Sequence, residues 1–564
     1  IAASTFIQRV RGDYDYNNLD RFLQDKVPNV LAQRNVGGKP YSGNNIALYG
    51  FANDNWKATR NLTINLGLRY EFNGVAKSMK EFALNKLADV PGVLTFFEPQ
   101  PQKKNFAPRV GFAYSPGNRA TTSIRGGFGI AYDQIFDNVG TNARPPQATS
   151  TVDQPVTETP GFLAGGGILP TAVGSSLTPA EARAATSSWL PNQQMGYSIT
   201  WNLGVQHVFA KDYTVEVRYL GNRGLHLLYQ LQLNRAAVVT PTHFLPTFLS
   251  PPSQATLDGL PLTLTQLTTE RNTAGIGNTM AQYGFTSNIT AYVPRGNSQY
   301  HGVAVDLNKR FSSHLMFKAG YTWSHLLDDS TAEVNSTTLS PRRPQDFNNI
   351  RGEWASSALD HRQRLSLTWV YETPWFQRDQ SWIKRNVLGN YQIAGTYAAE
   401  SPEYGTPQSA VDSNMNGDAA GDRVIVNGAG TPGTSSDVTA LKNSAGATVG
   451  YLAINPNAQF IRAQVGAYAN SGRNILPTRG INNFDFTVSK SINFNERMKL
   501  QLRADFFNGF NHPQYTPGRV NNINNTNRAN VTNYLTPGNP LFGQFDQVWA
   551  SNARNIQVGA RFSF

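Results

Sequence analysis

The chain has 564 residues, no cysteine, 15% charged residues and a formal net charge of +12. The absence of cysteine excludes disulfides, thiolate metal sites and a cysteine nucleophile. No stretch reaches the roughly 18 to 20 uninterrupted apolar residues that a membrane helix needs, so a helical membrane protein is excluded too. A transmembrane β-barrel is compatible with this composition, because each of its strands needs only about ten residues and half of these are polar.

Alternation of apolar and polar residues predicts about fourteen β-strands. In chain order they span 5–16, 46–57, 62–71, 105–114, 122–132, 195–209, 213–221, 298–311, 315–326, 364–373, 389–399, 482–493, 497–508 and 555–564. The third is the most regular, with an apolar residue at every second position from Leu62 to Tyr70. The last alternates in the same way from Ile556 and ends on the aromatic Phe564. These patterns argue strongly against a helix in either segment.

Two short helices are expected outside the strands. One falls within 17–25, and the other runs from Pro179 to Ser188. The second has Thr178 as its capping residue, proline at the first helical position and Glu181 at the third.

Short turns and long connections alternate along the chain. The long connections span about 17–45, 73–104, 133–194, 222–297, 327–363, 400–481 and 509–553. Every short turn then lies at one end of the sheet and every long loop at the other, which is typical of outer-membrane barrels with short periplasmic turns and long extracellular loops. The predicted fold is therefore an all-β, transmembrane, antiparallel up-and-down barrel, with the C-terminus at the periplasmic end.

The two faces of the predicted strands differ in composition. Aromatic residues on apolar faces fit the interfacial girdles of a barrel, although strand aromatics in a soluble core are the alternative. They are Tyr70, Trp201, Trp323, Trp369, Tyr397 and Phe506. Charged residues on polar faces fit a wet lumen, where structural ladders between strands are at least as good an explanation as ligand contact. They are Arg69, Glu71, Arg125, Asp306, Arg310, Lys318, Arg503 and Arg561.

Five phrases resemble TonB-dependent outer-membrane receptors, most closely the large Oar-like receptors of acidobacteria. They are DNWKATRNLTINLGLRYEF (54–72), GYTWSHLLDD (320–329), DFNNIRGEWASSALDHRQRLSLTWVYETPW (346–375), NFDFTVSKSINFNERMKLQLRADFFNGFNHPQY (483–515) and NIQVGARFSF (555–564). The resemblance implies a barrel of about 22 strands preceded by a plug, a TonB box and often a small regulatory-like domain. We expect residues 1–564 to be one partial barrel domain without those N-terminal parts. A self-contained pore of fourteen strands is the alternative.

One stretch suggests a metal site. Asp412, Asn414, Asn416 and Asp418 alternate with other residues and surround Gly417, as in the first half of a calcium loop. The twelfth position from Asp412 is Arg423 and not the glutamate that completes such a loop. The alternative is an Asx-rich loop held by its own side-chain hydrogen bonds. No cofactor is required, and calcium in this external loop is a hypothesis.

Enzyme signatures are missing from the sequence: it has no phosphate-binding loop and no His-Glu-x-x-His. His361, beside Asp360 and Arg362, is expected to form a hydrogen bond in a loop or in the lumen. Basic and aromatic residues sort onto opposite strand faces, so a nucleic-acid platform is not expected. We therefore expect no enzyme and no nucleic-acid partner.

The resemblance implies energised uptake, across the outer membrane, of a ligand that is large or scarce. Its implied partners are the TonB complex, reached through the N-terminal part, outer-membrane lipid and lipopolysaccharide, the barrel-assembly machinery and an unknown ligand. A passive outer-membrane pore and a surface adhesion or structural protein are the alternatives. The ligand could be an oligosaccharide, a peptide or a metal chelate, and the sequence does not distinguish among these three classes.

Overall fold

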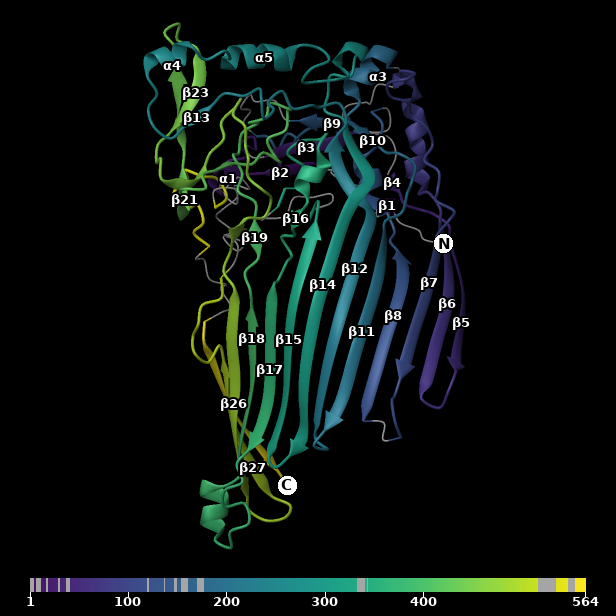
Figure 1. The fold of residues 1–564 in the computed structure, drawn as a ribbon, viewed down its shortest axis with the longest axis vertical. Helices are drawn as coiled ribbons and strands as arrows, with labels where there is room; N and C mark the ends of the chain where they lie inside the picture. The colour runs from purple at the N-terminus through teal and green to yellow at the C-terminus, as the bar shows by residue number, and fades with distance from the viewer. Residues whose placement is uncertain are drawn as a thin grey trace.

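The computed structural model describes residues 5–6, 12–16, 19–28, 31–36, 41–118, 121–135, 137–146, 150–153, 161–169, 177–331, 340–341, 343–515, 534–545 and 553–564. Its main feature is one large sheet, in which thirteen strands follow one another in chain order from β5 to β28 (Figure 1). Each inner strand is antiparallel to the strands before and after it on this path. The all-β up-and-down prediction is confirmed.

The strands of the path correspond to the second to fourteenth predicted strands. They are β5 (Ala47–Lys57), β6 (Leu62–Asn73), β7 (Phe106–Tyr114), β8 (Thr122–Tyr132), β11 (Tyr197–Phe209), β12 (Tyr213–Gln232), β14 (Thr290–Ser312), β15 (Leu315–Asp328), β17 (Gln363–Glu372), β18 (Tyr391–Glu400), β26 (Ile481–Asn493), β27 (Lys499–Phe507) and β28 (Asn555–Ser563). β12 and β14 are longer than predicted and continue as a two-stranded ribbon beyond a register shift between Gly224 and Leu227. This bulge interrupts the alternation on which the prediction depended.

The first predicted strand, 5–16, does not join the large sheet within the described residues, which omit 7–11. β1 (Thr5–Phe6) pairs with β4 (Tyr41–Ser42), and β2 (Asp13–Asp15) pairs with β3 (Leu31–Val36), each in a separate small sheet. Gly12 precedes β2 with a φ of +94°, a backbone conformation that a continuous strand does not use. The sheet path therefore has thirteen strands where fourteen were expected.

The short turns and the long connections lie at opposite ends of the sheet, as predicted (Figure 1). Tight turns join β11 to β12 and β14 to β15, and positive φ angles at Ala210, Lys211, Ser313 and His314 allow the chain to reverse there. The long connections gather at the other end, and the C-terminus lies at the end that carries the short turns.

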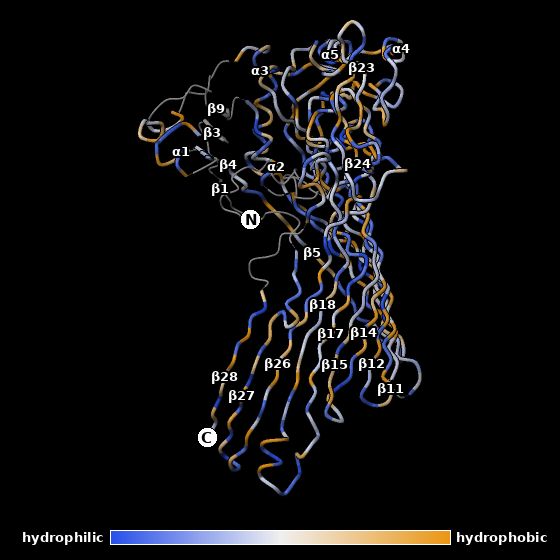
Figure 2. Tube along the Cα trace, turned by 90° about the vertical axis from the view of Figure 1, so that its left-hand side faces the viewer, coloured by the Kyte–Doolittle hydropathy of each residue, from blue (hydrophilic) through white to orange (hydrophobic). Residues whose placement is uncertain are grey.

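The register of the sheet separates an apolar face from a polar face, and hydropathy alternates along the strands in Figure 2. Leu203 faces Tyr219 on the apolar side, while its neighbour Gly204 faces Arg218 on the polar side. Large apolar side chains on the first face are exposed, for example Val558 at 77% and Trp323 at 56%. Exposed apolar side chains in this number fit a surface that contacts lipid.

Both edges of the sheet are free among the described residues. β5 pairs only with β6, and β28 pairs only with β27. The sheet is therefore curved but open, and each edge strand presents a row of unpaired backbone groups.

Buried residues concentrate in the long connections and not in the sheet. The predicted helices are present here as α1 (Leu19–Leu23) and α3 (Pro179–Ala185), and Thr178 and Glu181 form a capping box. α3 is shorter than predicted because Thr186 is already extended. Further helices are α2 (Asp137–Asn142), α4 (Gln254–Asp258) and α5 (Leu264–Asn272), with small sheets formed by β13 (Thr247–Phe248) with β22 (Val438–Lys442) and β23 (Thr448–Ala453), and by β20 (Ile425–Val426), β21 (Thr431–Ser436) and β24 (Ala458–Ile461). Among the described residues, no helix combines the length and the apolarity needed to cross a membrane.

Candidate ligand site among the long connections

A cavity of about 450 Å³ lies where three long connections meet. We call this cavity the loop pocket. The connections are those between β12 and β14, between β15 and β17, and between β18 and β26. Its lining residues are Ala237, Val239, Thr240, Pro241, Gln345, Asp346, Asn348, Asn349, Gly352, Glu353, Asn414, Arg423, Tyr468, Ala469, Asn470 and Ser471. The volume is within the range of small-molecule sites.

The connection between β15 and β17 forms one wall of the loop pocket through a short 3-10 helix, Ile350–Glu353. Asn349 caps this helix by accepting a hydrogen bond from the Gly352 amide at 3.3 Å. The Gln345 amide donates to a carboxylate oxygen of Glu353 at 3.0 Å. These local bonds fix the backbone that carries Asp346 and Asn348 into the lining.

A buried chain of alternating charges holds the connections together. Glu353 is paired with Arg423 and lies 3.9 Å from Nε of Arg473. Arg473 is paired in turn with Asp328, the last residue of β15, and its Nε also donates to the Glu353 carbonyl at 3.0 Å. All four residues are buried, and Arg473 is 2% exposed. Buried charges are tolerated only when they are paired in this way, so the network makes the arrangement of the loops specific.

Arg423 connects this network to the loop pocket. Its guanidinium also donates to the Ser471 carbonyl at 3.1 Å, which ties the two halves of the connection between β18 and β26 to each other. The pairing of Arg423 with Glu353 neutralises both charges at the wall of the pocket. The remaining lining is mainly amide, hydroxyl and small apolar groups.

The four residues proposed as calcium ligands lie together in one buried loop of this connection. Asn414 Oδ1 accepts from the Asn416 amide at 3.0 Å, and Asn416 Oδ1 accepts from the Asp418 amide at 2.8 Å. The side-chain amides of both asparagines donate to the Gln345 carbonyl. Asp418 is paired through both carboxylate oxygens with Arg343. Asp412 Oδ2 accepts from the Gly417 amide at 2.9 Å, and Asp418 Oδ1 accepts from the Ala420 amide at 3.1 Å. All four residues therefore make the local hydrogen bonds of an Asx-rich loop, and among the four Asp412 alone keeps a buried side-chain oxygen without a hydrogen-bond partner.

His361 lies where the connections after β15 and β18 meet. Its Nδ1 is 3.2 Å from the Ser401 carbonyl, and its two ring nitrogens lie 3.7 Å from Glu400 and 3.6 Å from Glu403. The hydrogen bond with Glu403 raises the pKa of His361 most, and burial opposes this. The predicted hydrogen-bonding role in a loop is thus confirmed.

Four of the eight charged residues predicted on polar strand faces, Arg69, Glu71, Asp306 and Arg503, form ion pairs, and one of these pairs, Asp306 with Arg218, joins neighbouring strands. Arg69 pairs with Glu71 at 2.7 Å, and Asp306 pairs with Arg218 of the neighbouring strand at 2.6 Å. Arg503 pairs with Asp505 at 2.7 Å. Within the part of the chain that the structure describes, these charges support the structural interpretation, and none of them lines the loop pocket.

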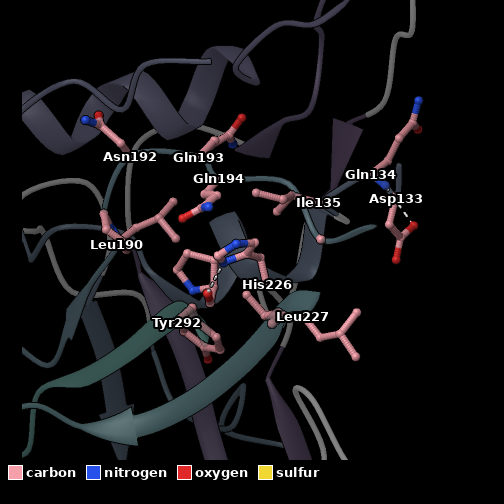
Figure 3. Close-up of a pocket in the computed structure, with 14 residues that line it drawn as sticks. Asp133, Gln134, Ile135, Leu190, Asn192, Gln193, Gln194, His226, Leu227 and Tyr292 are labelled. Atoms are coloured by element: carbon pink, nitrogen blue, oxygen red, sulfur yellow. Dashed lines mark hydrogen bonds between the residues drawn. The ribbon is translucent and has the colours of Figure 1, made fainter. Parts of the chain in front are cut away.

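A second cavity, at the end of β8 and beside the ribbon of β12 and β14, has a volume of only about 40 Å³ (Figure 3). Asp133, Gln134 and Tyr292 are among its lining residues. His226 has a φ of +54° at the bulge, and its Nδ1 donates to the Pro294 carbonyl at 3.2 Å. This volume suffices for water and is too small for a larger ligand. A third cavity, of about 220 Å³, lies at the short-turn end of the sheet and includes Glu372, Gln392 and Lys499 in its lining. The loop pocket is therefore the candidate ligand site among the long connections.

Comparison with known proteins places the chain in a family. Residues 3–557 match the family described as "Outer membrane beta barrel domain". No curated protein matches the sequence. Similar solved structures include the ferripyoverdine receptor of the outer membrane of Pseudomonas aeruginosa, which is 10% identical with a TM-score of 0.40 and is matched over 93% of this chain and 40% of its own.

Two further solved structures are similar to the same extent. The outer membrane transporter YddB of Escherichia coli is 10% identical with a TM-score of 0.38, over 94% of this chain and 48% of its own. The siderophore receptor PirA of Acinetobacter baumannii is 10% identical with a TM-score of 0.38, over 93% and 46%. This chain therefore spans less than half the length of each of these three proteins. With almost its entire length matched by one family, and with an exposed apolar face on its sheet, the chain belongs to the outer membrane beta-barrel domain family and is a protein of the outer membrane.

Proposed function

We propose that the protein is a TonB-dependent receptor of the Oar-like type, which captures a ligand in the loop pocket and takes it up across the outer membrane. The observation that carries this proposal is the loop pocket itself, because three external connections are held around it. Buried, paired charges hold the connections after β15 and β18. The connection after β12 is held by the amides of Val238 and Val239, which donate to the Asn414 carbonyl at 3.0 and 3.1 Å. A pocket that is already organised loses less entropy when it binds a ligand. The five sequence motifs that resemble this receptor family give independent support.

The open sheet favours a barrel that is larger than thirteen strands. Unpaired backbone groups of β5 and β28 would cost several kcal/mol each in lipid, so both edges require partner strands. Residues 1–564 are accordingly proposed to be a single barrel domain within a longer receptor, whose further part would contain the plug and the contact with TonB. The intact mass of the protein extracted from outer membranes should then exceed 62.0 kDa.

The lining of the loop pocket favours a ligand that carries no negative charge and is rich in hydroxyl groups, such as a piece of glycan, because Asp346 adds a carboxylate to the lining. Asn348, Asn470 and Ser471 offer donors and acceptors, while Glu353 and Arg423 neutralise each other. Tyr468 adds an aromatic surface. In the proposed role the protein catalyses no reaction; lipid, lipopolysaccharide and the barrel-assembly machinery are the remaining expected partners.

Filling the loop pocket tests this function. Asn348→Trp places a large ring at an exposed lining position, and Ala440→Trp places the same ring on an exposed position of β22 that does not line the pocket. Uptake of labelled oligosaccharides, peptides and ferric chelates would be measured in cells with and without an active TonB system. We expect energised uptake of oligosaccharide, reduced about tenfold or more by Asn348→Trp and unchanged by Ala440→Trp. Uptake that is independent of TonB, or equal in both variants, would contradict the proposal.

A further inference from the structure

Asp422 is a fully buried carboxylate with an incomplete set of partners. Its Oδ2 accepts hydrogen bonds from the Ser413 amide, from Ser413 Oγ at 3.2 Å and from the Asn414 amide at 3.3 Å. Its Oδ1 is buried and has no hydrogen-bond partner. The residue is 0% exposed, and no lysine, arginine or histidine of the described residues forms an ion pair with it.

A second carboxylate of the same loop shares this feature. Asp412 Oδ2 accepts from the Gly417 amide at 2.9 Å and lies 2.9 Å from Nη2 of Arg271. Asp412 Oδ1, like Asp422 Oδ1, is buried without a partner. Asp422 is therefore hydrogen-bonded to the two residues that follow Asp412. Each of these two carboxylates has one buried oxygen without a hydrogen-bond partner.

Ionisation of such a buried carboxyl group is costly unless a cation compensates the charge. An unpaired buried carboxylate loses its hydration without a matching gain. Asp418, in the same loop, shows how the fold satisfies a buried carboxylate elsewhere, because Arg343 pairs with both of its oxygens. No such partner reaches Asp422.

We propose that the free oxygens of Asp412 and Asp422 bind one calcium ion in this loop, with Asp422 taking the place that the sequence pattern suggested for Asp418. The described residues contain no group of three or more histidine, cysteine, aspartate or glutamate side chains that could hold a metal. The other ligands must then be neutral oxygens from carbonyl groups, amides or water. Calcium accepts six to eight such oxygens in flexible geometry, whereas Mg²⁺ requires a strict octahedron and Zn²⁺ favours nitrogen or sulfur.

The proposed ion goes beyond ligand uptake and bears on the shape of the loop pocket. Asn414 and Arg423 both line the pocket, and they flank the segment that contains Asp418 and Asp422. The Gly466 amide donates to the Ser413 carbonyl at 2.9 Å, which links the same loop to the segment that carries Tyr468. Calcium would therefore act as a structural ion that fixes one wall of the loop pocket.

The test is calcium binding by the protein purified in detergent from outer membranes, measured by calorimetry with Ca²⁺ alone and with Mg²⁺ as the comparison ion. We expect one Ca²⁺ per chain, weak or no Mg²⁺ binding, and a loss of affinity of about tenfold or more in Asp422→Asn and in Asp412→Asn, because each removes one ligand charge. Asp258→Asn is the control, since this exposed carboxylate lies in another connection. Its calcium affinity should equal that of the wild type.

Asp418→Asn distinguishes a site formed by Asp412 and Asp422 from the site with Asp418 that the sequence pattern suggested. In the structure, Arg343 pairs with both carboxylate oxygens of Asp418. The calcium affinity of Asp418→Asn should stay within about threefold of the wild type. The gel shift on heating, which reports a folded barrel, must be the same in all variants, so that any loss of binding is local. No calcium binding by the wild type, or binding that Asp418→Asn abolishes and Asp422→Asn retains, would overturn the proposal.

Discussion

The sheet and the external connections are stabilised in opposite ways. In the sheet, backbone pairing is nearly continuous from β5 to β28, while large apolar side chains such as Val558 remain exposed for contact with lipid. In the connections, regular structure is short, and most buried side chains of the molecule are found there, including Leu245, Leu267 and Phe285 at 0% exposure. The stability of the sheet therefore comes from backbone hydrogen bonds and from contact with the membrane. The stability of the connections comes from side-chain packing and paired charges, as in a soluble domain.

The largest expected effect comes from breaking the buried charge chain. Arg473→Met leaves Asp328 and Glu353 buried without their shared partner, which should cost about 3–5 kcal/mol. We expect rapid proteolysis of the long connections while the barrel keeps its gel shift on heating. Arg364→Met removes an exposed arginine paired with Glu400 and serves as the control. Loss of the barrel itself in Arg473→Met would contradict the independence of the two regions.

A charge on the lipid face should damage the sheet alone. Leu203 is half exposed on the apolar face of β11, so Leu203→Lys should destabilise the barrel by about 2–4 kcal/mol near the membrane centre. Gln206→Lys, in the same strand, faces Glu216 on the polar side and should be tolerated. The free energy of unfolding in lipid vesicles measures both. Equal effects of the two lysines would show that the faces have been assigned wrongly.

The smallest effect concerns pH. Because its folded pKa is raised above 6.5, protonated His361 stabilises the contact between its connection and Glu403 fully below pH 6.5. This contribution is lost as the pH rises through the raised pKa. The side chain is one-third exposed, so solvent screening should limit the effect to less than about 1 kcal/mol. Proteolysis of the segment around Glu403 should accelerate slightly between pH 6 and pH 8, and His361→Gln should remove this pH dependence.

The sheet could be predicted from sequence because its signal is local. The alternation from Leu62 to Tyr70 specifies one lipid face whatever lies elsewhere in the chain, and β6 spans this segment. The prediction failed where the alternation is interrupted, at Gly12 and at the bulge after Gly224. The helix at Pro179 was predicted because its capping box is also local.

The candidate site could not be predicted in the same way. Arg473 and Asp328 are 145 residues apart, and Arg343 and Asp418 are 75 apart, so no periodic pattern connects them. The Asx-rich loop was recognised from the spacing of Asp412 and its neighbours, but the importance of Asp422 depends on its burial and on an oxygen that has no hydrogen-bond partner among the described residues. Such properties arise only when distant connections pack together.

Hydrogen exchange with mass spectrometry tests most directly whether the external connections form a folded unit. The Ser471 amide donates to the Val424 carbonyl at 3.1 Å, and the Leu245 amide donates to the Gly466 carbonyl at 2.8 Å. Peptides containing these amides should be protected in the wild type, and Arg473→Met should remove that protection while the strands stay protected. Rapid exchange of these peptides in the wild type would contradict the account, since the loop pocket would then have no fixed walls.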